Sequence, residues 1–219
     1  MGCELGDENS KRGHSVHTYP ALIAKHMDIP YECLAYGGAS NTGIANMIMH
    51  HDIQDAILLV QWTYESRIGM HTNFNINGNH YIEHKNGVKW FDFAPGHWDF
   101  DPNVDIGSQL PRKAMLAGLP KFNNDLYRIA GNDETFLLIA DLAMKSTLHH
   151  VSLHNTKVLF FTASDQLIGR NGCMGFEGKN FLQFAHSHNC DMGPYGHPLH
   201  EAHRLAADHI LQNVNMFDD

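Results

Sequence analysis

The run AILLVQW at residues 56–62 carries the clearest strand signal in this chain of 219 residues. A continuous apolar run of this length is typical of a strand that is buried on both faces of a parallel sheet. Three further runs follow the same pattern: 32–36, 158–162 and, more weakly, 181–185. The sequence therefore predicts a parallel sheet built from short buried strands.

Helical patterns alternate with these strands. In the last of them, apolar residues recur at three-four spacing from Leu199 to Val214, as on the buried face of a helix. Strands that alternate with helices indicate a doubly wound α/β sheet, and this length suits a single domain, 1–219. Four segments are predicted as helices: 19–26 after an N-cap at Thr18, 41–48 after a cap at Ser40 or Asn41, 133–150 and 199–214.

Composition argues against several kinds of partner. The formal charge is −9 with only 15 Lys and Arg, and binding to nucleic acid or to an anionic membrane needs clustered positive charge. The four cysteines are scattered and form no C-x-x-C pair, so neither a zinc knuckle nor a disulfide framework is expected. No apolar run reaches about 20 residues, and the N-terminus lacks signal-peptide features. We expect a soluble protein, cytoplasmic or virion-associated.

Eighteen histidines raise the question of a metal site. His80 and His84 have i, i+4 spacing, but Asn-Gly turns flank them, and the neighbours His149 and His150 point in different directions on a helix. Zinc sites need ligand pairs at helical or hairpin spacing together with further ligands. We therefore predict no metal and no cofactor, and we expect these imidazoles to be surface and capping residues.

Residues from about 69 to 132 break the alternation of strands and helices. This stretch is rich in Asn, Gly, Pro and aromatic residues, including Trp90, Trp98 and Phe100. A structureless loop of this length is uncommon in a compact domain, so we predict an insertion made of a hairpin and short helices. Its aromatic residues have two interpretations, a sugar-stacking surface or a small satellite core beneath the insertion.

Polar residues follow the predicted strands at the sheet edge where open α/β sheets bind ligands. The turn GGASN at 37–41 opens a helix, and its backbone N–H groups suit an oxyanion. The segment WTYESR at 62–67 follows the next strand. His197 stands just before the helix-starting Pro198, on a rigid loop end that suits a general base. We expect these three segments to lie at the same edge.

Four blocks follow one another along the chain: Tyr19-Pro20-Ala21-Leu22-Ile23, Gly37-Gly38-Ala39-Ser40-Asn41, Gln61-Trp62-Thr63 with Arg67, and Gly196-His197-Pro198 with Ala206. In their order and spacing they resemble the SGNH (GDSL-type) hydrolase superfamily, in particular its phage and environmental branch. The resemblance implies a flavodoxin-like α/β/α sandwich and an activity of ester hydrolysis or deacetylation. It implies His197 as the general base, the Gly38 N–H as an oxyanion donor, and a substrate site formed by Ser40, Asn41, Trp62, Thr63 and Arg67.

The chain departs from this family at three blocks. The strand that ends in Gly-Asp-Ser and carries the nucleophile has no counterpart ahead of Gly2, and no apolar strand precedes the similar letters that end at Ser10. Thr63 or Tyr64 stands where the family has an asparagine. Pro194 replaces the acid three residues before the histidine, which leaves Asp191 either to orient the imidazole or to be a solvated loop acid.

Two functions therefore remain open. In the first, the chain is an N-terminally truncated SGNH-type serine esterase or carbohydrate deacetylase that lacks its first strand and is inactive as given. Its substrate would be an acylated small molecule or carbohydrate. In the second, the fold is a non-catalytic carbohydrate-binding or virion structural module that uses the aromatic insertion.

Overall fold

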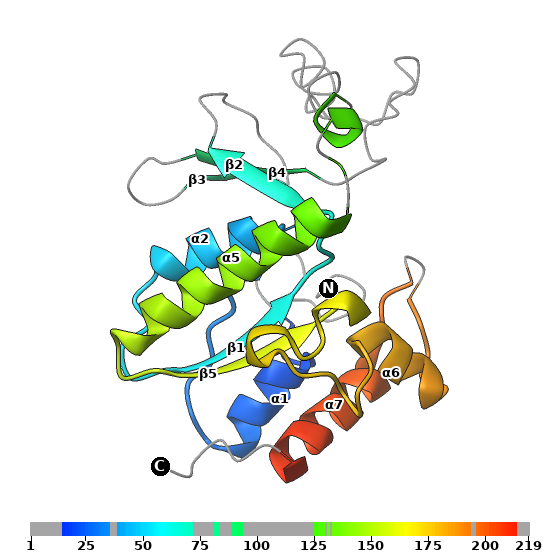
Figure 1. The fold of residues 1–219 in the computed structure, drawn as a ribbon. Coiled ribbons are helices and arrows are strands. Elements are labelled where there is room, and N and C mark those ends of the chain that lie inside the picture. Colours follow the sequence, from blue (N-terminus) through cyan, green and yellow to red (C-terminus); the bar gives the residue numbers. More distant parts are fainter. Residues whose placement is uncertain are drawn as a thin grey trace, which may run out of the picture. The chain divides into compact units, whose positions relative to one another are not determined.

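The computed structural model describes residues 15–35, 39–71, 81–83, 89–93, 125–129, 131, 133–193 and 196–213. They form helices, a small parallel sheet and an antiparallel sheet (Figure 1). The mixed α/β class that the sequence predicts is confirmed. The chain divides into two compact units: unit 1 comprises residues 1–34, 55–61 and 156–219, and unit 2 comprises residues 35–54 and 62–155.

The parallel sheet joins β1 (Ile57–Trp62) to β5 (Lys157–Thr162). All of β1 except its last residue, Trp62, belongs to unit 1. The backbone N–H of Lys157, at the start of β5, donates to the carbonyl of Ala56, which directly precedes β1 (3.0 Å). The two strand starts therefore lie together, so the strands run in the same direction. The strands predicted at 56–62 and 158–162 are confirmed.

The core of unit 1 is aromatic. Phe176 is fully buried and its ring stacks on that of Phe161, with centroids 5.0 Å apart. The edge of the Tyr19 ring, on α1 (Tyr19–His26), meets both of these rings. The helix α7 (His200–Asn213) packs against α1 through small side chains that allow a close approach. Its buried face includes Ala202, Ala206 and Ile210, as the spacing predicts.

The segment predicted as a strand at 181–185 is a helix, α6 (Phe181–Ser187). Asn180 and Gln183 form a capping box, in which the Asn180 side chain accepts from the Gln183 N–H (2.9 Å) and the Gln183 side chain accepts from the Asn180 N–H (3.3 Å). Phe181 and Phe184 are buried at helical spacing. The strand prediction is wrong because this apolar run has a period of three to four, with a cap at its start.

The strand predicted at 32–36 is also wrong over its described part. Residues 31–35 have no regular secondary structure, and Glu32 and Ala35 are exposed. A strand in the middle of a sheet would bury both of these side chains. Tyr36 lies outside the described residues.

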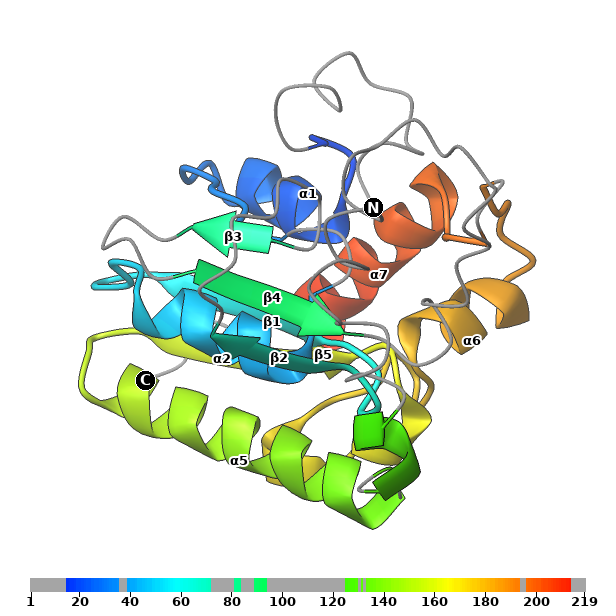
Figure 2. The ribbon, with the colours of Figure 1, turned by 90° about the horizontal axis from the view of Figure 1, so that it is seen from above.

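Unit 2 contains α2 (Asn41–Met49) and α5 (Asp133–Ser152), which pack against each other. α2 also contacts β2 and β4 of the antiparallel sheet, whose order is β2-β4-β3 (Figure 2). The strands are β2 (Ile68–His71), β3 (Tyr81–Glu83) and β4 (Lys89–Phe93), and a short helix covers 125–129. These elements lie in the stretch predicted as an insertion. Four of its aromatic residues lie outside the described residues: Phe74, Trp98, Phe100 and Phe122.

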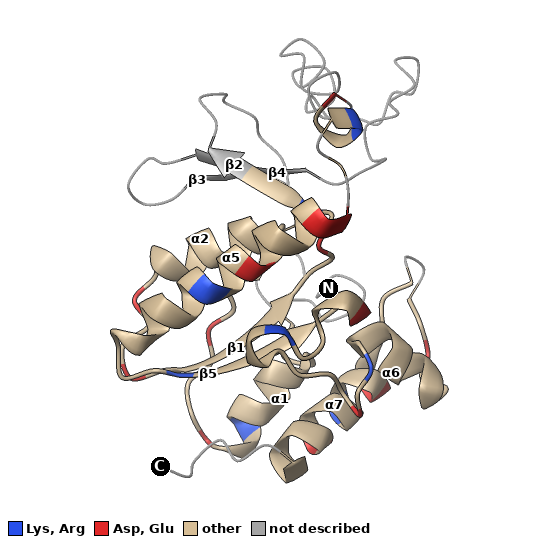
Figure 3. Cartoon of the chain, viewed as in Figure 1, with Lys and Arg blue, Asp and Glu red and all other residues tan. Residues whose placement is uncertain are grey.

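The helices predicted near 19–26, 41–48, 133–150 and 199–214 are confirmed as α1, α2, α5 and α7. Two short 3-10 turns, η3 (Asp165–Leu167) and η4 (Arg170–Gly172), follow β5. Lys and Arg are scattered singly along the described chain of each unit (Figure 3). Within the described ranges, no helix combines the length and the apolar character needed to cross a bilayer.

Candidate functional site

His197 lies on a tight hairpin that leads into α7. The Gly193 N–H donates to the His197 carbonyl (2.8 Å), and the Leu199 N–H donates to the Asp191 carbonyl (3.1 Å). Gly196 closes the turn with a φ of +75°, a left-handed conformation that glycine adopts without steric cost. Residues 191–193 and 196–199 are thus held together by backbone hydrogen bonds before the helix begins.

The register of this hairpin places Asp191 and His197 on the same face. Met192 pairs with Pro198, so Asp191 and His197 are diagonal neighbours on the opposite face from that pair. Diagonal side chains on an antiparallel pair lie roughly 7–8 Å apart at their bases, within reach of longer groups. Pro198 is buried, whereas Asp191 and His197 are both exposed. This arrangement suits a carboxylate that orients an imidazole.

The polar residues at the start of α2 are buried and bonded inside unit 2. Ser40 is fully buried, and its hydroxyl caps α2 by accepting from the Gly43 N–H (3.0 Å). The amide of Asn41 pairs with the backbone of Thr63, accepting from its N–H (2.9 Å) and donating to its carbonyl (3.3 Å). The Asn41 side chain therefore stands in for a neighbouring strand and fixes the chain just after β1.

Trp62 and Arg67 differ in their exposure. Trp62 is fully buried, whereas Arg67 is half-buried and its guanidinium lies over the ring of Tyr64, 5.6 Å from the centroid. A tight turn brings the side chains of Tyr64 and Arg67 together, because the Arg67 N–H donates to the Tyr64 carbonyl (3.2 Å). Of the substrate-binding residues predicted in unit 2, Arg67 is among the more accessible.

Within unit 1 the hairpin register places the predicted base, His197, and the predicted acid, Asp191, on the same exposed face. Within unit 2 the structure brings together Ser40, Asn41 and Thr63. The predicted oxyanion donor Gly38 and the serine considered at Ser10 lie outside the described residues.

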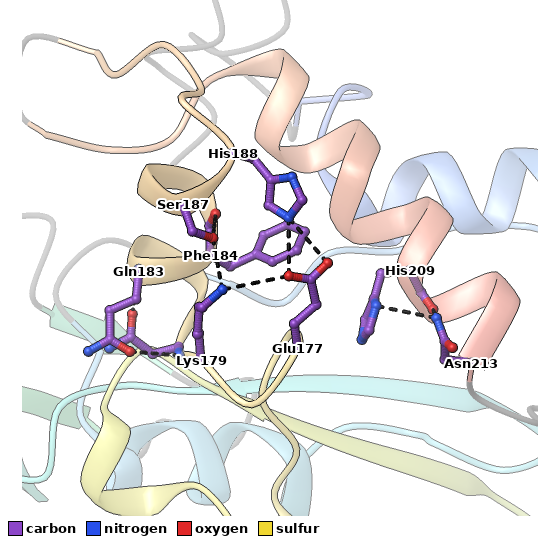
Figure 4. A network of polar contacts seen from close by, with 9 residues as sticks. Glu177, Lys179, Gln183, Phe184, Ser187, His188, His209 and Asn213 are labelled. Carbon is purple, nitrogen blue, oxygen red and sulfur yellow. Dashed lines mark hydrogen bonds and ion pairs between the residues drawn. The ribbon is translucent and has the colours of Figure 1, made fainter.

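A second polar cluster, which the sequence did not indicate, surrounds Glu177 (Figure 4). The Nε2 of His188 lies 3.2 Å from both carboxylate oxygens of Glu177, and Lys179 Nζ lies 3.7 Å from one of them. The hydrogen bond from His188, followed by the nearby positive charges, lowers the pKa of Glu177 despite some desolvation. Lys179 also donates to the hydroxyl of Ser187 (3.1 Å). The cluster is exposed, and it ties the turn at Glu177 to the end of α6.

The turn that carries Glu177 has a recognisable sequence signal. Glu177 and Gly178 have φ values of +52° and +73°, and Phe176 pairs with Lys179 across them. Two consecutive positive φ values are characteristic of a hairpin turn, in which glycine at the second position is favoured. The glycine predicts the turn, but the position of His188 depends on how the turn packs against α6.

His203 is a buried histidine in the core of unit 1, only 1% exposed. Its Nδ1 accepts from the Tyr19 N–H (3.2 Å), so its Nε2 carries the proton. That Nε2 has no hydrogen-bond partner among the described residues. Burial lowers the pKa of His203 to about 4. His203 is therefore a neutral packing residue at pH 7.

Within the described ranges, no three His, Cys, Asp or Glu side chains are arranged to hold a metal ion. Comparisons with family models, curated proteins and solved structures give no match for this chain. The resemblance to SGNH hydrolases stays a prediction, and the assignment of function depends on the residues themselves.

Proposed function

We propose that this chain is an SGNH-type domain, with a flavodoxin-like arrangement, for hydrolysis of an acyl ester on a small molecule or carbohydrate. One observation carries the proposal: Asp191 and His197 share the exposed face of the hairpin that leads into α7. A carboxylate beside an accessible imidazole is the acid–base half of a hydrolytic triad.

In the proposed reaction, His197 takes the proton of a serine hydroxyl as its oxygen attacks the ester carbonyl carbon. The carbonyl electrons move to the oxygen, which carries the negative charge of the tetrahedral intermediate. His197 then gives the proton to the leaving alcohol, and water releases the acyl group by the same route. Asp191 would hold the second ring nitrogen of His197. Ser40 is ill-suited as the nucleophile, because it is fully buried and caps α2.

The test uses a fluorophosphonate probe and p-nitrophenyl acetate, applied to this chain and to the reading frame extended upstream of Met1. No Gly-Asp-Ser block follows an apolar strand in the 219 residues, so we expect near-background hydrolysis from this chain, equal to that of His197→Ala. The polypeptide that carries the nucleophile should be labelled, and His197→Ala should lower its rate by at least about 10²-fold. His186→Ala is the matched control, because His186 is an exposed histidine on α6 of the same unit.

Two results would overturn the proposal. One is that neither polypeptide is labelled by the probe. The other is that labelling occurs but the hydrolysis rate does not depend on His197. Mapping the labelled peptide would then identify the reactive serine directly.

A non-catalytic carbohydrate-binding or virion structural role is the second candidate. It is favoured by the burial of Ser40, Asn41 and Trp62, since Ser40 and Asn41 use their polar groups inside unit 2. This role predicts that the chain binds acylated polysaccharide equally well with and without His197→Ala. Titration calorimetry with the polysaccharide distinguishes it from the hydrolase.

A further inference from the structure

Histidines gather at the C-terminal ends of α2 and α5 in unit 2. His50 is the C-cap residue of α2, His149 and His150 lie in the last turn of α5, and His154 follows that helix. α2 and α5 pack against each other, and both run toward the same end of unit 2 (Figure 1). We call His50, His149, His150 and His154 the histidine end.

Two of these imidazoles are close enough to share a ligand. The rings of His150 and His154 have centroids 4.8 Å apart and planes tilted by 55°. Two imidazoles that bind one ion through nitrogens at about 2.0–2.1 Å, with a bond angle near 90–110°, have centroids roughly 5 Å apart. His150 Nε2 is also buried and has no hydrogen-bond partner among the described residues. A bound ion would satisfy this nitrogen.

The hydrogen bonds around the histidine end fix the ring protons on the nitrogens that face protein oxygen. His154 Nδ1 lies 3.4 Å from the amide oxygen of Gln54, and His50 Nδ1 lies 2.8 Å from the Asn46 carbonyl. Both oxygens can only accept, so both Nδ1 atoms carry the proton and the lone pair is on Nε2. This is the outer-shell arrangement that orients metal-binding histidines.

The helix ends beside these imidazoles favour a cation. The C-terminal ends of α2 and α5 carry partial negative charge, which stabilises a nearby cation.

We propose that His150 and His154 form a two-imidazole site for a divalent late first-row transition-metal ion. The part of the chain that the structure describes offers no set of three ligands, so water completes the coordination. Imidazole nitrogen selects Cu²⁺, Ni²⁺ and Zn²⁺ over Mg²⁺ and Ca²⁺, and the affinity order should place Cu²⁺ first. The proposal is independent of the hydrolase.

The test is calorimetric titration of Cu²⁺, Zn²⁺ and Mg²⁺ into the metal-free full chain. Loss of an outer-shell partner typically lowers metal affinity by about 10–100-fold, so loss of a direct ligand in His150→Gln or His154→Gln should lower it by more than about tenfold. Gln54→Ala keeps both imidazoles and should weaken binding through the orientation of His154. Mg²⁺ should not bind, and His186→Gln on α6 of unit 1 is the matched control that should leave the affinity unchanged.

Because the chain has 18 histidines, a readout specific to each residue is also needed. Zn²⁺ should protect His150 and His154 from modification by diethyl pyrocarbonate more than the other histidines, as mapped by mass spectrometry. Circular dichroism verifies that each variant is folded, and His154→Gln alone decides the outcome if His150→Gln unfolds. Uniform protection, or unchanged affinity in folded His154→Gln, would mean an adventitious ion only and would overturn the proposal.

Discussion

His203 in unit 1 and His150 in unit 2 share an unusual property. Each has a buried Nε2 without a hydrogen-bond partner among the described residues, and burial lowers the pKa of each. Their surroundings differ. His203 lies among the rings of Tyr19 and Phe181, whereas His150 lies at a helix end among other imidazoles. The unsatisfied Nε2 is a packing cost at His203 and a ligand position at His150.

The cost at His203 is offset by what its other nitrogen does. Tyr19 is the first residue of α1, and its backbone N–H is one of the groups that a helix cannot satisfy internally. The Thr18 side chain donates to the Ser15 carbonyl (3.3 Å), and His203 supplies the acceptor for the Tyr19 N–H (3.2 Å). A side chain of α7 thus caps α1.

The largest expected difference between the two histidines is in stability. His203→Ala removes a packed ring and leaves the Tyr19 N–H unsatisfied, which should cost unit 1 about 3–5 kcal/mol. His150→Ala should change stability by less than about 1 kcal/mol, since the ring is only half-buried. Hydrogen exchange of the α1 and α7 amides, compared with those of α2 and α5, measures the two effects separately. Equal losses would show that the two positions do not differ.

The second prediction concerns pH. The pKa of His203 is about 4 when folded, against an ordinary value of 6.5. Between these values the unfolded chain binds more protons than the native one. The free energy of unfolding should therefore fall by about 3 kcal/mol as the pH drops from 6.5 to 4, and this residue adds no pH dependence above 6.5.

The His203→Gln variant isolates this pH effect. Glutamine retains an acceptor for the Tyr19 N–H but cannot be protonated, so the variant should lose the fall in stability that His203 causes. Urea unfolding at pH 7, 5.5 and 4.5 measures the slope for both proteins. An identical slope in the wild type and the variant would show that His203 does not remain neutral in the fold.

The sequence predicts the elements whose apolar spacing is regular, and it fails where spacing and run length conflict. β1 and α7 follow directly from their patterns. The pattern Asn180-x-x-Gln183 at the start of α6 is a capping signal that predicts a helix, and it outweighs the short apolar run that it overlaps. Residues 32–36 are apolar enough for a strand, but composition does not indicate whether a sheet partner exists.

The candidate sites show the same limit more sharply. Asp191 is predictable as the first acid that precedes His197 in the sequence, and the hairpin register then places both on one face. The contact between His203 and Tyr19 joins residues 184 positions apart, and no local pattern indicates it. His150 and His154 have the i, i+4 spacing of a ligand pair, but His154 lies beyond the end of α5, so a helical pattern alone does not pair them.

The smallest expected effect tests what holds His203 in place. Tyr19→Phe keeps the ring that stacks on His203 (5.9 Å between centroids) and the backbone N–H that it accepts from. It removes only the hydrogen bond from the Tyr19 hydroxyl to Gln61 Oε1 (3.2 Å). Gln61 is half-buried, so water can partly replace this bond, and the expected loss of unfolding free energy is about 1 kcal/mol.

Tyr64→Phe is the control for this last change, because Tyr64 is a 41% exposed tyrosine of unit 2 and its replacement should alter stability by less than about 0.5 kcal/mol. Urea unfolding of both variants at pH 7 gives the comparison. If Tyr19→Phe were as costly as His203→Ala, the hydroxyl of Tyr19 would be what positions His203. The difference between the two histidines would then depend on a single polar bond to β1, and the aromatic packing around His203 would contribute little.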